Sequence, residues 1–136
     1  MLRAKCVLLI CLVGCLVGCL PAGNTDPEVF RAEWNAVSEV LGDPVALHDM
    51  SFVTMPYDEL QEWCNNDGCL GHQEWNTIML ANPPIDHCDS QDGNDEKFGS
   101  VVIHEMLHVN GFDHGDHMYS AQERAWSKFA AMECDF

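Results

Sequence analysis

The stretch Ser100-Val-Val-Ile-His-Glu-Met-Leu-His-Val-Asn-Gly-Phe-Asp-His114 decides the fold, because it requires one long helix followed by a sharp turn. Its apolar residues lead into His104 and predict a helix over residues 98–110. Gly111 then ends the helix, since a residue without Cβ can turn the chain sharply. His114, three residues further on, can therefore return toward the helix.

The helix places two histidines where one metal ion can hold both. His104 and His108 are four residues apart, so their imidazoles project from the same helix face. Glu105 lies beside this pair and can take a proton from water that the metal activates. With His114 as third ligand, three neutral imidazoles leave the fourth tetrahedral position open, which is typical of catalytic zinc.

This pattern resembles a known zinc signature. His104-Glu105-x-x-His108-x-x-Gly111-x-x-His114 matches the metzincin metallopeptidases, and Met118-Tyr119 looks like the Met-turn of matrixins. The resemblance implies that the three histidines bind zinc, that Glu105 is the general base and that Met118 forms a hydrophobic floor under the metal. It also implies an α+β minidomain with a small twisted mixed sheet, an N-terminal helix, an active-site helix and a C-terminal helix.

The sequence departs from the family in two places, and Leu107 stands where matrixins usually have Gly. Only three residues separate His114 from Met118, a shorter spacer than metzincins normally have. Asp116 and His117 fall inside this spacer and stay open as alternative third ligands.

Two other functions compete with a zinc endopeptidase that hydrolyses peptide bonds. Asp67-Gly68-Cys69-Leu70 vaguely resembles the ligand motif of peptide deformylases, in which Cys69 would be a metal ligand with a free thiol. The other alternative is a non-catalytic zinc-binding envelope lipoprotein. Glu105 beside an open fourth position favours catalysis, since a purely structural site would more often close that position with another ligand.

The rest of the chain predicts the remaining elements. Helical spacing of apolar residues and capping signals indicate helices at 26–41, 57–63 and 120–133, the last opened by a capping box of Ser120 and Glu123. Residues 76–81 read as a strand, along which an extended peptide substrate could pair main chain to main chain.

The amino terminus predicts export. Arg3 and Lys5 precede an apolar run, and Leu16-Val17-Gly18-Cys19 resembles the lipobox of bacterial lipoproteins. We expect a signal peptide at 1–18, a short tether at 19–25 and a peptidase domain at 26–136, with Cys19 lipidated. Cys15 ends a similar motif and remains an alternative. The resemblance implies a lipid anchor in the bacterial cell envelope, at the outer membrane if the cell is Gram-negative.

Charge narrows the partners. Of the 136 residues, 118 remain after an 18-residue signal; removing Arg3 and Lys5 from six basic residues leaves four, against 22 Asp and Glu, a formal charge of −18. Nucleic acid is therefore a poor partner, because phosphate binding needs a basic surface. We expect a monomer that acts on a peptide or protein and contacts the membrane through its lipid.

The remaining cysteines form an even set. Export leaves Cys64, Cys69, Cys88 and Cys134, and an oxidising compartment predicts two disulfides among them. We favour Cys64 with Cys69 and Cys88 with Cys134, although three pairings are possible. A zinc site of all four would need two close pairs, and only one is close.

The loop from Asp86 to Glu96 is strongly acidic. It carries Asp86, Asp89, Asp92, Asp95 and Glu96, together with Gly93. It is either a solvated loop or a calcium site, since calcium takes several carboxylate oxygens.

Overall fold

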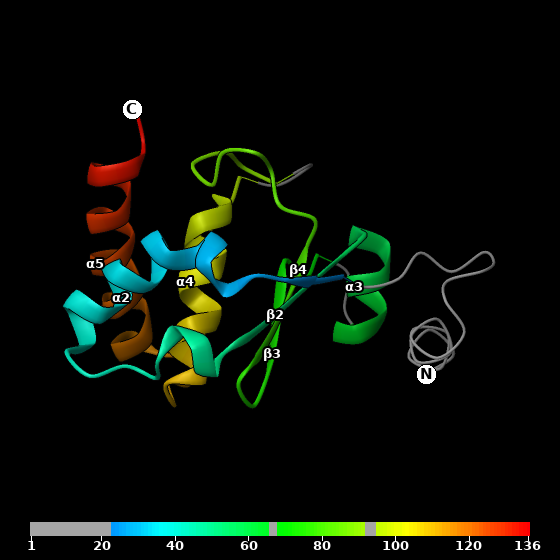
Figure 1. The fold of residues 1–136 in the computed structure, drawn as a ribbon, viewed down its shortest axis with the longest axis horizontal. Coiled ribbons are helices and arrows are strands. Elements are labelled where there is room, and N and C mark those ends of the chain that lie inside the picture. The colour runs from blue at the N-terminus through cyan, green and yellow to red at the C-terminus, as the bar shows by residue number, and fades with distance from the viewer. Residues whose placement is uncertain (1–22, 66–67, 92–94) are drawn as a thin grey trace.

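The computed structural model describes residues 23–65, 68–91 and 95–136 (Figure 1). The predicted signal peptide, Cys15, Cys19 and the beginning of the tether lie outside these described residues. Their processing and lipidation stay predictions.

A four-stranded mixed sheet forms the centre of the fold, with the order β1-β2-β4-β3. Strand β2 runs parallel to β4, while the two outer strands are antiparallel to their neighbours. The strands are β1 (Gly23–Thr25), β2 (Ser51–Met55), β3 (Gly71–Glu74) and β4 (Thr77–Ala81). This sheet, with helices at both ends of the chain, confirms the predicted α+β class.

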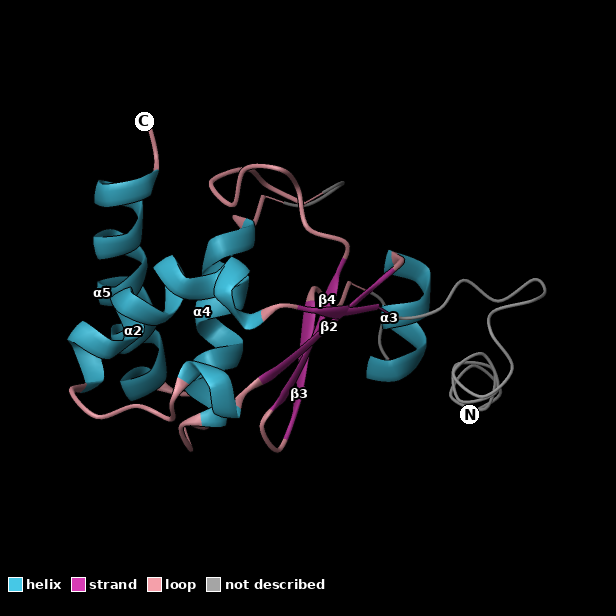
Figure 2. Ribbon diagram, in the orientation of Figure 1, coloured by secondary structure: helices cyan, strands magenta, loops and turns pink. Residues whose placement is uncertain are grey.

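Helices cover both faces of the sheet. In β4, Ile78 and Leu80 join the main core, whereas Met79 and Ala81 join a second cluster on the opposite face. Such alternation follows from the two-residue period of a strand. Figure 2 shows the sheet between α3 (Tyr57–Cys64) on one side and the remaining helices on the other. These are α2 (Arg31–Leu41), α4 (Phe98–Val109) and α5 (Asp116–Glu133).

The predicted N-terminal helix is confirmed, with a tighter first turn. A 3-10 turn, η1 (Pro27–Phe30), precedes α2, and Asp26 caps it by accepting a hydrogen bond from the backbone N–H of Glu28 at 3.0 Å. Gly42, with φ of 84°, ends α2.

Helix α4 is almost wholly buried, and it confirms the helix predicted at 98–110. Val102, Ile103, Met106 and Leu107 are each 0% exposed. The partly exposed residues of α4 are Ser100, His104, His108 and Val109. The first three are four residues apart and therefore form one stripe along the helix. Gly111, with φ of 91°, follows the helix in the left-handed region that favours glycine.

The C-terminal helix begins earlier than the sequence predicted. Helix α5 starts at Asp116 after Gly115, so Ser120 lies inside the helix and the predicted capping box of Ser120 and Glu123 is wrong. Met118 lies in the first turn of α5 and is 0% exposed, as part of the main core. The backbone at Met118 is helical, so the residues that resemble a Met-turn in sequence form the beginning of α5.

The edge strands were not predicted. Strand β1 falls within the segment assigned to the tether, and β3 has a polar sequence, Gly-His-Gln-Glu, without the alternation that marks a half-buried strand. The predicted strand is β4, but β2 and β3 pair with its two edges. The expectation that a peptide pairs along residues 76–81 is therefore wrong, and the open edge next to α4 belongs to β3.

Both favoured disulfides are present. Cys64 bonds Cys69, and Cys88 bonds Cys134, with Cα–Cα distances of 6.3 and 5.6 Å. The deformylase alternative is wrong, because Cys69 has no free thiol. The two disulfides indicate an extracytoplasmic protein. In the part of the chain that the structure describes, no helix combines the length and apolarity needed to span a membrane.

The two disulfides should differ in their contribution to stability. Chain-entropy arguments give about 4 kcal/mol for the Cys88–Cys134 bond and about 2 kcal/mol for Cys64–Cys69, because the first closes the longer loop. We expect Cys88→Ala with Cys134→Ala to lower the free energy of unfolding more than Cys64→Ala with Cys69→Ala. Urea unfolding of both double variants measures this, and equal losses would contradict it.

A buried acid lies between α2 and the loop after β4. Glu33 is 1% exposed, and its carboxylate lies 2.9 Å from Nδ1 of His87. The His87 ring stacks on Phe30 and meets Phe98 edge-on. Burial raises the pKa of Glu33, and the hydrogen bond with His87 opposes this rise.

The raised pKa of Glu33 predicts that ionisation of this carboxyl lowers the free energy of unfolding as pH rises. A carboxyl whose pKa is higher in the folded state contributes most stability at low pH and loses that contribution as pH rises through the folded pKa. Glu33→Gln cannot ionise and should gain stability relative to wild type as pH rises from about 4 to 8. Urea unfolding at several pH values gives the difference directly. A difference independent of pH would contradict this prediction.

Candidate metal centre

Three imidazoles converge at the end of α4. The Nε2 atoms of His104, His108 and His114 lie 3.2 Å from one another in all three pairs. His104 and His108 come from α4, while the turn at Gly111 brings His114 back, as predicted. Among the described residues this is the group of His, Cys, Asp and Glu side chains close enough to share a metal ion.

The other ring nitrogens fix which atoms face the centre. Nδ1 of His104 lies 2.9 Å from Oε1 of Gln122, and Nδ1 of His108 lies 2.8 Å from the carbonyl oxygen of Phe112. Oxygen acceptors require N–H donors, so each Nδ1 carries the proton of its neutral ring. Both Nε2 atoms then present lone pairs to each other, and no hydrogen bond can join them.

This donor set fits a zinc ion. Zinc–nitrogen bonds of about 2.0–2.1 Å in a tetrahedral site place the nitrogens about 3.3–3.4 Å apart, close to the 3.2 Å observed. Imidazole nitrogens also bind copper, iron and nickel, so the geometry is compatible with several metal ions, zinc among them. The cluster is compatible with a zinc site of the His-Glu-x-x-His type with a more distant third histidine.

Glu105 lies against the sheet next to this cluster. It is 5% exposed, and its Oε2 is buried with no hydrogen-bond partner in the described part of the chain. Gly71, the first residue of β3, packs so closely that an added Cβ would lie 2.9 Å from Cγ of Glu105. The absence of a side chain at Gly71 therefore leaves room for the carboxyl group.

Burial sets the protonation of the site. It raises the pKa of Glu105 to about 7, so near neutral pH both forms of the carboxyl are populated. Burial also lowers the pKa of His104, although its hydrogen bond with Gln122 opposes this shift. The lowered pKa favours the neutral imidazole, which is the form that binds a metal.

A cleft of about 380 Å³ opens at the cluster. One side is formed by the start of β3 and the residues before it, and the other by α4 and α5. Its lining includes His104, Glu105, Tyr119, Gly71 and Gln122. The Tyr119 ring stacks on that of His114, with centroids 6.4 Å apart. The three-histidine cluster and the buried carboxyl group thus adjoin a space that a ligand can enter.

The structure also places the other predicted residues. Asp116 and His117 begin α5 and are exposed, and neither belongs to the cluster, which contains His114 instead. The calcium site in the acidic loop stays a prediction, since Asp92 and Gly93 lie outside the described residues.

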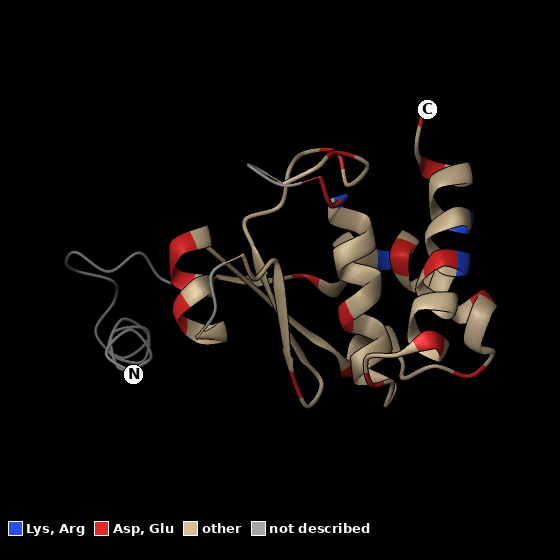
Figure 3. Cartoon of the chain, turned by 180° about the vertical axis from the view of Figure 1, so that it is seen from behind, with Lys and Arg blue, Asp and Glu red and all other residues tan. Residues whose placement is uncertain are grey.

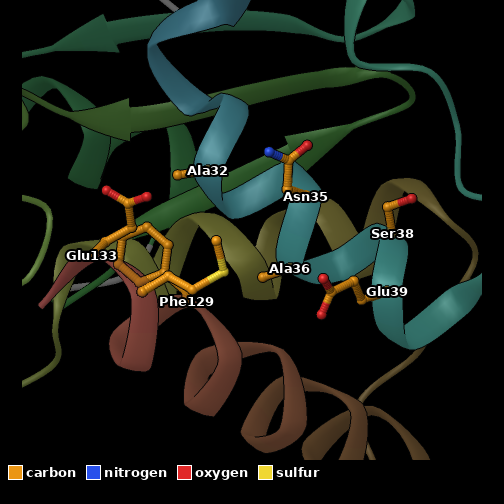
Figure 4. Close-up of a pocket in the computed structure, with 8 residues that line it drawn as sticks. Ala32, Asn35, Ala36, Ser38, Glu39, Phe129 and Glu133 are labelled. Carbon is orange, nitrogen blue, oxygen red and sulfur yellow. The ribbon is translucent and has the colours of Figure 1, made fainter.

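A second hollow lies between α2 and α5, away from this centre. It has a volume of about 290 Å³, and Figure 4 shows Phe129 and Glu133 together on one side of it and Glu39 on the other. Among the described residues, the lining of this hollow contains no group of side chains that could share a metal ion.

Charge is distributed unevenly over the fold. The sequence contains no Lys or Arg between Ala32 and Glu96, so β2, α3, β3 and β4 carry none. Figure 3 shows acidic positions across the fold, whereas the basic ones lie on the helical side opposite α3. The side of the cleft formed by β3 therefore has no basic side chain among its described residues.

Comparisons with known proteins do not assign this chain to a family. No protein-family model, curated protein or solved structure matches it.

The sequence missed three residues that shape the site. Gln122 accepts a hydrogen bond from His104 and donates one to Ser100, and Gly71 packs on Glu105. Helical spacing could have indicated Ser100, which lies one turn before His104. Gln122 and Gly71 reach the site through tertiary packing, which no local sequence pattern indicates.

The third ligand is tested by substitution. We expect His114→Ala to weaken zinc binding by more than the 10- to 100-fold typical of losing an outer-shell partner, because a direct ligand is removed. Chelator competition measures this affinity. His117→Ala is the matched control, since this exposed histidine lies outside the cluster. A larger loss for His117→Ala would contradict the geometry.

Proposed function

We propose that this protein is a zinc-dependent endopeptidase with a metzincin-like centre. One observation carries the proposal: three Nε2 atoms that are 3.2 Å apart adjoin a buried carboxyl group, Glu105, in an open cleft. His104, His108 and His114 would hold the ion, and Glu105 follows the first of them in sequence, as in the metzincin signature.

In the proposed reaction, the zinc ion and Glu105 have different roles. Bound zinc would supply Lewis-acid catalysis, polarising the peptide carbonyl and making water more acidic. Glu105 accepts the proton of the attacking water on its carboxylate and returns it to the leaving amine nitrogen. Burial supports this role, because Oε2 has no competing hydrogen bond among the described residues.

The substrate would bind along β3. This strand ends the sheet beside α4, and its outer edge carries no partner strand in the described part of the chain. An extended peptide can add to such an edge through main-chain hydrogen bonds. Gly71 would bring the peptide to Glu105, since the two residues are in close contact.

Charge favours neutral or basic peptides. Glu96 lines the cleft with Glu105, and the described residues that line it include no Lys or Arg. An acidic peptide would therefore meet repulsion that salt only partly screens. The lipid anchor would hold this activity at the cell envelope.

A non-catalytic zinc protein is the second candidate. Its support is the three-histidine cluster itself, which can hold an ion without any catalytic role. It would use the same three histidines but would have no need for Glu105.

One variant separates the two candidates. Glu105→Gln should reduce kcat/KM for peptide cleavage by about 10²–10⁴-fold, because it removes the general base. The glutamine side chain has nearly the same shape, so the packing should remain. Zinc binding should remain, since the three ligands are unchanged. The assay uses a mixed peptide library with mass-spectrometric detection on the mature, disulfide-bonded protein.

Glu123→Gln serves as the matched control, because it makes the same change at an exposed acid of α5. Stoichiometric zinc with equal cleavage by wild type and Glu105→Gln would defeat the peptidase and favour the non-catalytic protein.

A further inference from the structure

The orientation of the His104 ring depends on a hydrogen bond to a side chain, which a substitution can remove. Its Nδ1 donates to Oε1 of Gln122 on α5, at 2.9 Å. His108 differs, because its Nδ1 donates to the backbone carbonyl of Phe112, which no side-chain substitution removes. The two α4 ligands are therefore held by different kinds of acceptor.

Gln122 is itself held in place. Its Nε2 donates to Oγ of Ser100 at 3.2 Å. Ser100 lies one helical turn before His104, on the partly exposed stripe of α4. A chain of two hydrogen bonds thus runs from Ser100 through the Gln122 amide to the His104 ring, and it connects α4 to α5.

The amide orientation determines what His104 can do. With Oε1 facing the ring, the proton stays on Nδ1 and the Nε2 lone pair points to His108 and His114. Without this acceptor, the proton can move to Nε2, where it would block metal binding. The ring would also lose a restraint on its rotation.

We infer that Gln122 is a positioning residue of the metal centre, which fixes the tautomer and orientation of His104 through the Ser100–Gln122–His104 hydrogen bonds. This inference rests on the proposed metal centre but not on peptidase activity. It gives α5 a direct role in the site besides its packing against α4.

Zinc affinity provides the first test. Gln122→Leu removes the acceptor while keeping a good helix former, and should weaken zinc binding by about 10- to 100-fold, the usual effect of losing an outer-shell partner. Gln122→Glu retains an acceptor for Nδ1 and should bind zinc at least as tightly as wild type. Glu123→Leu changes the neighbouring exposed residue of α5 and should have no effect.

The metal-free protein provides a second, independent test. Nitrogen-15 NMR of the imidazoles at mildly alkaline pH should show the Nδ1–H tautomer of His104 in wild type and in Gln122→Glu. In Gln122→Leu the Nε2–H tautomer should become populated, while His108 keeps its Nδ1–H tautomer. Circular dichroism establishes that each variant remains folded.

The outcomes distinguish the two ideas. If wild type binds no zinc, the metal centre is overturned and this inference with it, even where the His104 tautomer still depends on Gln122. If Gln122→Leu keeps wild-type zinc affinity, or keeps the wild-type tautomer, the positioning role is overturned while the metal centre stands.

Discussion

Two neutral imidazole nitrogens with facing lone pairs repel each other, and the centre of this protein is built on such a contact. Nδ1 of both His104 and His108 donates to an oxygen, so neither Nε2 carries a proton, yet they lie 3.2 Å apart. A cation shared by both removes the repulsion, and the nearby Nε2 of His114 completes a three-nitrogen donor set. The electrostatics of the three imidazoles therefore suit them to hold a metal ion, and this argument does not depend on any family resemblance.

The rest of the fold serves to hold α4 in place. Its apolar faces pack into the main core, which leaves the stripe of Ser100, His104 and His108 open toward the cleft. The loop after β4 satisfies the N-terminus of the helix, where the backbone N–H groups of Phe98 and Gly99 donate to Asp89 and His87. The Cys88–Cys134 disulfide connects this loop to the end of α5.

The parts that sequence predicts are those with local causes. Helical spacing and Gly111 predicted α4 and the return of His114, because both depend on residues a few positions apart. The polar strand β3 could not be predicted, since its place depends on hydrogen bonds with β4 rather than on alternation. The burial of Glu33 was not predicted, because it depends on packing against His87, which is distant in the sequence. Gln122 was missed because another helix brings it to His104.

The short edge of β3 limits what a bound peptide could gain. Only alternate residues of a strand direct their backbone N–H and C=O groups toward one neighbour, and β3 has four residues, Gly71–Glu74. A peptide on this edge would form only a few main-chain hydrogen bonds, each with a net contribution of about 1 kcal/mol. Short edges also protect a protein from pairing with its own copies. A peptidase with this edge would therefore bind substrates weakly through their backbone, and its selectivity would come from the cleft beside Glu105 and Tyr119.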